Sequence, residues 1–285
     1  MKNSKPNIWA RLLKKAQKTD PSLNRRMAML KRLFCALMMF GTALIVAGCT
    51  TTKTDLAAAT NPLRIGVASD YPPIIFKQGG VIAGMEADLA VNLAKNLNRP
   101  YQFVETSWDK LIPDLLNGRI DIIMSGMSIT EERQVRIDFC NPYLKTGQMA
   151  LIRRTDAARF QTPAQIMMNR SDVGVQKGTT GAQLVRQQFA NAKEVAFLSA
   201  HDAALALSRN RIDMLIHDAP VIWWLASENE ATLTVANHTL TEEYLAWAIR
   251  RDDSKLKDSI NQALEKMKSD GALNRIFKRW MPGAP

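Results

Sequence analysis

Cysteine is scarce in this chain of 285 residues, which contains three: Cys35, Cys49 and Cys140. The first two fall in an N-terminal leader, so only Cys140 remains for the folded part and no disulfide is expected within it. No histidine lies near Cys140 in the sequence, which favours a structural cysteine over a catalytic thiol. The three histidines likewise lack the spacing of zinc ligands. This scarcity argues against a disulfide framework and gives no support to a metal site or another cofactor.

A basic excess is lacking outside the first 48 residues. The formal net charge is +11, but residues 1–48 carry ten lysines and arginines against one acidic residue, and the remainder carries 28 against 26. A nucleic-acid-binding protein needs basic residues clustered in its folded part. The charge distribution therefore argues against nucleic acid as a partner and directs attention to the leader.

Long hydrophobic runs are few, and the run at residues 33–48 has 16 residues, fewer than the ~20 that cross a bilayer as a helix. It follows a basic segment, so residues 1–48 are predicted to be a signal peptide. The run ends in Val46-Ala47-Gly48-Cys49, which resembles the bacterial lipobox. That resemblance implies a lipoprotein, with Cys49 lipidated, palmitate included, and first in the mature chain. An uncleaved anchor and an ordinary export signal remain alternatives, and Met27 and Met29 are alternative starts.

Residues 49–61 are mostly small and polar after the cysteine, and we expect them to form a flexible tether between the lipid and the folded part. Thr50 stands where, by resemblance to other lipoproteins, an aspartate favours retention in the inner membrane. We therefore expect a periplasmic protein anchored to a membrane by lipid, with the outer membrane preferred over the inner one.

Short apolar runs alternate with longer amphipathic runs from residue 63 onward, in the order strand, helix, strand, helix, strand. The second half repeats this order. The predicted segments are 63–68, 85–98, 101–105, 108–118 and 120–126 in the first half, and 172–176, 181–190, 194–198, 202–210 and 212–218 in the second. A strand over 243–251 and a helix over 256–280, broken near residues 270–271, follow. The pattern predicts an α/β protein of two lobes with largely parallel sheets.

Polar residues follow the third predicted strand, at the edge of the sheet where ligands bind in open α/β folds. Thr130 is suited to cap a short helix. Arg133 then lies in the first turn, where a cation opposes the helix dipole, so we expect a compensating anion. Its planar fork matches a carboxylate, and polar groups of Gly126 and Ser128 would complete the clamp. Pairing of Arg133 with a nearby surface carboxylate is the alternative.

Three other strand ends carry matching features. Lys177-Gly178-Thr179-Thr180-Gly181 precedes a helix, and free N–H groups at such a start bind anions, although glycine before a helix is common. Asp218 ends another strand, where it would pair with an ammonium or act as an N-cap. The first strand leads into Asp70 and Tyr71, whose ring lies in a proline-stiffened loop or simply packs there. With Trp108, these groups suit the zwitterion of an α-amino acid.

The motifs between residues 62 and 281 resemble the family 3 extracellular solute-binding proteins, the polar-amino-acid-binding group. These motifs are GMEADLAVNLAKNL, FVETSWDKLIPDLLNGRIDIIMSGMSITEER, IDFCNPY, VGVQKGTTGAQ and IDMLIHDAPVI. The resemblance implies a periplasmic-binding-protein-like fold of type II, with lobe 1 over 62–150 plus 245–285 and lobe 2 over 151–244. It also implies two crossover hinge strands, near 148–154 and 238–247, and hinge closure over the ligand.

The resemblance also implies roles for individual residues. Arg133 binds the α-carboxylate with help from Gly126, Ser128 and Thr179 or Thr180, and Asp218 binds the α-amino group. Trp108 and Tyr71 flank the ligand side chain. A protein of this kind acts as a monomer that delivers its amino acid to an ABC permease, with no catalysis and no cofactor.

The ligand and two competing functions remain open. Asp70 and Trp108 suit a cationic side chain, but Ala68 stands where some basic-ligand members carry a carboxylate, so a polar or basic amino acid is preferred only slightly. The chain also resembles cyclohexadienyl or arogenate dehydratases of the same fold. Its residues 181–183 are Gly, Ala and Gln, which lack the general acid expected after the Gly-Thr loop. A ligand-sensing lipoprotein without a transport role is the other alternative.

Overall fold

The computed structural model describes residues 61–282. The predicted signal peptide, the predicted lipidation site at Cys49 and nearly all of the predicted tether lie outside these residues. Within the described range, the helices are all too short or too polar to cross a membrane.

The first lobe is built on a five-stranded sheet in which β1 pairs in parallel with β5 and β6, while β15 runs antiparallel between β6 and β7. In order across the sheet, the strands are β5 (Tyr101–Glu105), β1 (Leu63–Val67), β6 (Ile122–Ile123), β15 (Ala248–Ile249) and β7 (Asp138–Phe139). The helical segments of this lobe are α4 (Met85–Asn96), η1 (Trp108–Lys110), α5 (Leu111–Leu116), α6 (Glu131–Gln134), α11 (Ser254–Ser269) and α12 (Ala272–Trp280). A small antiparallel sheet adds β2 (Asp70–Tyr71), β3 (Ile75–Gln78) and β4 (Val81–Ala83).

The second lobe repeats the arrangement with a second five-stranded sheet. Its strands, in order, are β11 (Lys193–Phe197), β10 (Asp172–Gln176), β12 (Met214–Asp218), β9 (Gln148–Arg153) and β13 (Leu233–Ala236). Its helical segments are η2 (Arg154–Arg159), α7 (Pro163–Met168), α8 (Thr180–Gln188), α9 (Ala200–Ser208) and α10 (Ala219–Glu228). β10 is parallel to β11 and β12, as the alternation of strands and helices predicts.

The central strand β12 of the second sheet is buried on both faces, which explains its apolar run Met214–Ile216. Along β12, Met214 and Ile216 pack into one hydrophobic cluster with Ala182 and Val185 of α8, and Leu215 packs into another. That other cluster includes the buried faces of α9 and α10. Burying a side chain of this size contributes about 1.5–3 kcal/mol, so β12 is held from both sides.

The C-terminal helical segment breaks where the sequence predicts. Ile260, Leu264 and Met267 of α11 are fully buried at helical spacing. Gly271 then adopts a φ of +73°, a left-handed conformation that glycine reaches without a steric penalty, and α12 begins at the next residue.

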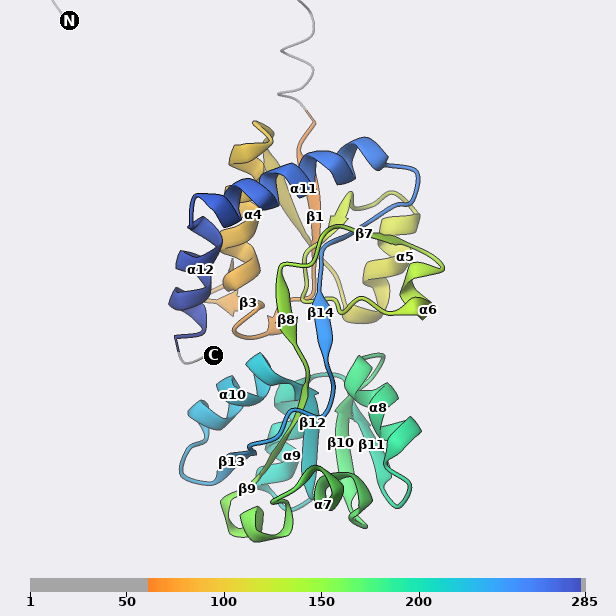
Figure 1. Cartoon of the computed structure of the whole chain (residues 1–285), viewed down its shortest axis with the longest axis vertical. Helices are drawn as coiled ribbons and strands as arrows, with labels where there is room; N and C mark the ends of the chain where they lie inside the picture. Colours follow the sequence, from red (N-terminus) through yellow and green to blue (C-terminus); the bar gives the residue numbers. More distant parts are fainter. Residues whose placement is uncertain (1–60, 283–285) are drawn as a thin grey trace, which may run out of the picture. The chain divides into compact units, whose positions relative to one another are not determined.

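Two antiparallel strands connect the lobes: β8 (Leu144–Thr146) and β14 (Glu243–Leu245) (Figure 1). The first crossover was expected at 148–154, but that segment forms β9, paired with β12 and β13 in the second sheet. Burial explains the difference. Residues 148–152 are all buried and need a strand on each side, whereas residues 144–146 are only partly buried or exposed and can cross between the lobes. The predicted strand over 243–251 divides in the same way, into the crossover β14 and the sheet strand β15.

Candidate functional site

One cavity between the two sheets gathers the polar strand ends. It has a volume of about 20 Å³ and joins, through four shared lining residues, a larger outer cavity of about 770 Å³. All nine residues predicted to bind ligand line the inner cavity. The inner lining consists of Ala68, Asp70, Tyr71, Trp108, Ser125, Gly126, Ser128, Arg133, Gln176, Thr179, Thr180, His217 and Asp218.

Arg133 lies in the first turn of α6, and the Thr130 hydroxyl accepts a hydrogen bond from its backbone N–H, 3.2 Å away. The guanidinium donates to the Ser128 carbonyl at 2.7 Å and to the Gly178 carbonyl at 3.3 Å. It also stacks over the Trp108 ring, 5.4 Å from the ring centre. Within residues 61–282, no carboxylate lies within 4.0 Å of Arg133, so the alternative of a surface ion pair is not observed there. The cation is held by carbonyl dipoles and an aromatic face.

The Gly178 carbonyl accepts a hydrogen bond from a second side chain of the first lobe. Trp108, from η1 of the first lobe, donates its indole N–H to the Gly178 carbonyl at 3.1 Å. Gly178 precedes α8 in the second lobe and has a φ of +78°. Two side chains of one lobe therefore meet a single backbone oxygen of the other, at the junction of the inner and outer cavities.

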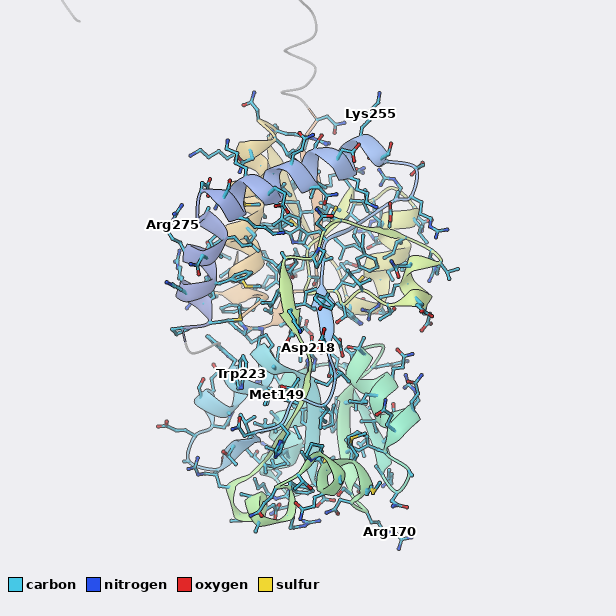
Figure 2. The ribbon with its side chains drawn as sticks, viewed as in Figure 1. Met149, Arg170, Asp218, Trp223, Lys255 and Arg275 are labelled. Atoms are coloured by element: carbon cyan, nitrogen blue, oxygen red, sulfur yellow. The ribbon has the colours of Figure 1, made fainter. Side chains whose placement is uncertain are left out.

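Asp218 lies at the end of β12 that faces the first lobe (Figure 2). It occupies the N-cap position of α10, but its side chain does not cap that helix. Instead the buried carboxylate accepts hydrogen bonds from the Tyr71 hydroxyl and from the Gln148 amide. Burial raises the pKa of Asp218 well above its usual value, and the negative charge of Glu243 adds to this. The simple N-cap interpretation therefore does not describe this residue.

His217 supports Asp218 as a neutral ring. Its Nδ1 accepts from the Asp218 backbone N–H at 2.8 Å, so Nε2 carries the hydrogen and donates to Gln176 Oε1 at 3.0 Å. Burial lowers the pKa of His217 to about 4. The ring also lies 5.3 Å from that of Tyr71, so it helps hold the phenol against Asp218.

Gly126 has no side chain to collide with the Tyr71 ring, and its backbone N–H already donates a hydrogen bond within the first lobe. Its φ is +63°, and a Cβ at this position would approach the Tyr71 ring to 2.3 Å. Its N–H donates to the buried Glu86 at 2.8 Å, and Tyr143 donates its hydroxyl to the same carboxylate at 2.6 Å. Burial raises the pKa of Glu86 to about 7.

The hydroxyl groups at the site are engaged as well. Thr179 caps α8, because its Oγ1 accepts from Ala182 N at 3.3 Å, and the hydroxyl donates to the Gln176 carbonyl at 2.7 Å. The Ser128 and Thr180 hydroxyls both contact the Glu243 carboxylate. Asp70 is exposed and also lines the outer cavity.

Several polar residues at the cavity were not identified from the sequence: Ser125, Gln176 and His217 in its lining, and Glu86, Gln148 and Glu243 next to it. For Gln148 a signal was available, because an amide in an otherwise apolar run that becomes a buried strand requires a partner. Glu243 and Glu86 stand in ordinary strand and helix patterns, and only the fold brings them near the cavity.

The family model for the bacterial extracellular solute-binding proteins, family 3, matches residues 63–283. The chain is 30% identical to a probable histidine-binding protein of Campylobacter jejuni, over 88% of this chain and 99% of that one. It is also 30% identical to the ABC transporter arginine-binding protein 1 of Escherichia coli, over 84% and 98% of the two chains.

Among solved structures, an ancestral amino acid-binding protein described as a precursor of cyclohexadienyl dehydratase aligns with a TM-score of 0.72 and 35% identity. The alignment covers 77% of this chain and 95% of that one. The two-lobe α/β architecture is that of the type II periplasmic-binding-protein-like fold. The chain belongs to the bacterial extracellular solute-binding proteins, family 3.

Proposed function

We propose that this protein captures an amino acid outside the cytoplasm and delivers it to an ABC permease. The observation that carries the proposal is that a cation of the first lobe, Arg133, and a buried carboxylate of the second, Asp218, line one cavity. A zwitterion supplies the opposite charge to each at the correct ends. The histidine- and arginine-binding relatives support this class of ligand and the transport role.

In the proposed complex, Arg133 takes the α-carboxylate, together with the N–H groups in the first turn of α8. Asp218 takes the α-ammonium, which replaces the Tyr71 hydroxyl on that carboxylate. Tyr71 and Trp108 then flank the side chain of the ligand. Release requires the lobes to part, and the crossover strands β8 and β14 are the elements about which they would rotate.

The ligand side chain would extend toward the outer cavity, and the lining there suits a polar or basic group. That lining contains three acidic and three basic side chains: Asp70, Glu105 and Asp109, and Arg133, Arg136 and Lys177. Arg133 is assigned to the α-carboxylate, and Glu105 already pairs with Lys77 at 2.8 Å, so the remaining acidic and basic groups balance. We therefore propose a polar or basic amino acid without a strong preference between the two.

We further propose that the mature protein begins at Cys49 and is a monomer held in the periplasm by acyl chains on that residue, at the outer membrane in preference to the inner. The basic leader, the 16-residue apolar run and the lipobox-like end support this. Mass spectrometry of the mature N-terminal peptide tests it. An unmodified Cys49, or membrane association that survives Cys49→Ser, would refute the lipid anchor.

Catalysis is not part of the proposal. The curated relatives are transport-binding proteins, and the residues that follow the Gly-Thr loop of α8, Gly181 to Gln183, include no acid that could donate a proton. The likeness to the ancestral precursor of a dehydratase makes prephenate and arogenate necessary controls.

Isothermal titration calorimetry tests the function directly. The full chain, purified in detergent and freed of ligand by unfolding and refolding, is titrated with the twenty amino acids, ornithine, cystine, prephenate and arogenate. We expect micromolar or tighter binding of an L-amino acid without turnover. Silence across the panel would favour the sensor interpretation, and consumption of prephenate or arogenate would favour the dehydratase.

A further inference from the structure

The carboxylate of Glu243 joins three parts of the molecule at the hinge. Glu243 lies on the crossover strand β14. Its oxygens lie 2.7 Å from Ser128 Oγ of the first lobe, 2.8 Å from Thr180 Oγ1 of the second lobe, and 2.9 Å from Thr241 Oγ1 in the segment that leads into β14. A single hinge residue thus contacts both walls of the inner cavity.

These contacts fix the direction of the hydroxyl groups. An ionised carboxylate can only accept hydrogen bonds, so both Ser128 and Thr180 donate to Glu243. Thr180 Oγ1 in addition accepts from the Gln148 amide at 3.1 Å. The hydroxyl oxygen of Ser128, which lines the cavity, therefore presents lone pairs and no hydrogen to a ligand.

Glu243 also adds a negative charge close to Asp218, strong enough to contribute to the raised pKa of that carboxyl group. Within the part of the chain that the structure describes, no nitrogen of lysine, arginine or histidine lies within 4.0 Å of Glu243. Its charge also favours the charged form of Arg133, so Glu243 acts electrostatically on both charged groups of the cavity. Beside Asp218, a second carboxylate favours a nearby cation.

We propose that Glu243 is a positioning residue for the α-amino group of the ligand, which it serves by holding Ser128 Oγ as an acceptor and by adding a second negative charge beside Asp218. The inference rests on the proposed function and assigns this end of the site to an ammonium. A glutamine at position 243 would lack the charge. Its amide nitrogen would also need an acceptor, which would turn a hydroxyl hydrogen of Ser128 or Thr180 toward the cavity.

The test compares ligands that differ only at the α-position. The full chain and its Glu243→Gln variant are titrated with L-arginine, L-lysine, L-histidine and L-glutamine, each paired with its 2-hydroxy acid analogue. We expect Glu243→Gln to weaken binding of the amino acids by about tenfold or more, as loss of a hydrogen-bond network to a charged group does. Binding of the hydroxy acids should change by less than about threefold, so the preference for nitrogen falls.

Two further variants separate positioning from a merely structural role. Glu242→Gln is the matched control, because Glu242 is an exposed neighbour that pairs with Lys145 at 2.8 Å and does not line the inner cavity. It should leave the preference intact. In a Ser128→Ala background, the effect of Glu243→Gln on amino acid binding should shrink, because the oxygen that Glu243 orients is absent.

The outcomes separate this inference from the proposed function. Equal losses for amino acids and hydroxy acids, or an undiminished effect in the Ser128→Ala background, would show that Glu243 is only a structural tie. No amino acid binding by the parent chain would overturn the proposed function and the inference together.

Discussion

The two lobes hold their charged groups in contrasting ways. In the first lobe, Arg133 is partly exposed and is held by carbonyl oxygens and the Trp108 ring. In the second, Asp218 is buried, and its carboxylate rests on Tyr71 of the opposite lobe. Both groups also have a partner in the opposite lobe, Gly178 for Arg133 and Tyr71 for Asp218, so the contrast lies in burial: the cation is partly exposed and the carboxylate is buried. From the proposed function we therefore expect the α-carboxylate of the ligand to reach Arg133 before its ammonium reaches Asp218.

A second contrast concerns buried groups behind the cavity. In the first lobe, burial raises the pKa of Glu86 to about 7, and in the second, burial lowers the pKa of His217 to about 4. Both side chains are therefore neutral in the folded protein near pH 6. Their contributions to stability therefore change with pH in opposite directions, because neutral Glu86 carries a proton whereas neutral His217 has lost one.

The largest expected effect comes from removing the cation of the first lobe. Arg133→Ala should cost ~2–5 kcal/mol of amino acid affinity, because the ligand carboxylate would then be buried without its partner. Calorimetry measures the loss, and Arg119→Ala is the control, since Arg119 is exposed and pairs with Asp114 away from the cavity. A loss smaller than about tenfold would remove Arg133 from its assigned role.

The second effect tests the buried carboxylate. Asp218→Asn should lower amino acid affinity by about 2 kcal/mol or more. The same change should raise the stability of the unliganded protein at pH 8, because a buried group whose pKa is raised destabilises the fold when it must ionise. Calorimetry and thermal melts measure the two quantities. Affinity and stability moving in the same direction would contradict this account of Asp218.

A third prediction uses the pH response of the first lobe. The folded protein keeps a proton on Glu86 up to about pH 7, whereas the unfolded chain loses it near 4.5. Stability from this group is therefore present below pH 4.5 and is lost as pH rises through 7, by up to about 3 kcal/mol. Glu86→Gln should gain stability relative to the parent across this window. A difference that stays constant from pH 4.5 to 7.5 in urea titrations would refute it.

The smallest net effect is expected when both lobes are changed. His217 contributes stability above pH 6.5 that is lost as pH falls through about 4, which is opposite in sign to the Glu86 contribution. The single variant His217→Gln should no longer lose this stability as the pH falls from 6.5 to about 4. In the Glu86→Gln, His217→Gln double variant, the two changes should largely cancel between pH 4.5 and 6.5. A double variant whose slope follows either single variant would show that the groups are not independent.

The sequence predicts the strands and helices that place the site, because their apolar periodicity is set by burial on both faces of each sheet. Asp218 could be selected for the same reason, since it ends a strand, and Thr130 and Arg133 because they begin the helix that comes after one. Glu243 and Gln148 could not, because they come from the hinge region and reach the cavity only through pairings between distant segments. The hydrogen bond from the Gly126 N–H to Glu86 could not be predicted either, because the two residues are 40 apart in the chain.

The Gly178 carbonyl has a consequence for how new ligand preferences could arise. Trp108 and Arg133 reach across the cleft to this oxygen, which belongs to the main chain and is the same whatever side chain the residue carries. Substitutions elsewhere in the loop over 177–180 can change which ligands fit without removing the contact that draws the lobes together. Position 178 is constrained because a φ of +78° strains any residue other than glycine, and Thr179 and Thr180 are constrained by their own hydrogen bonds. Closure and selectivity are therefore separable traits in this loop, each free to vary while the other is kept.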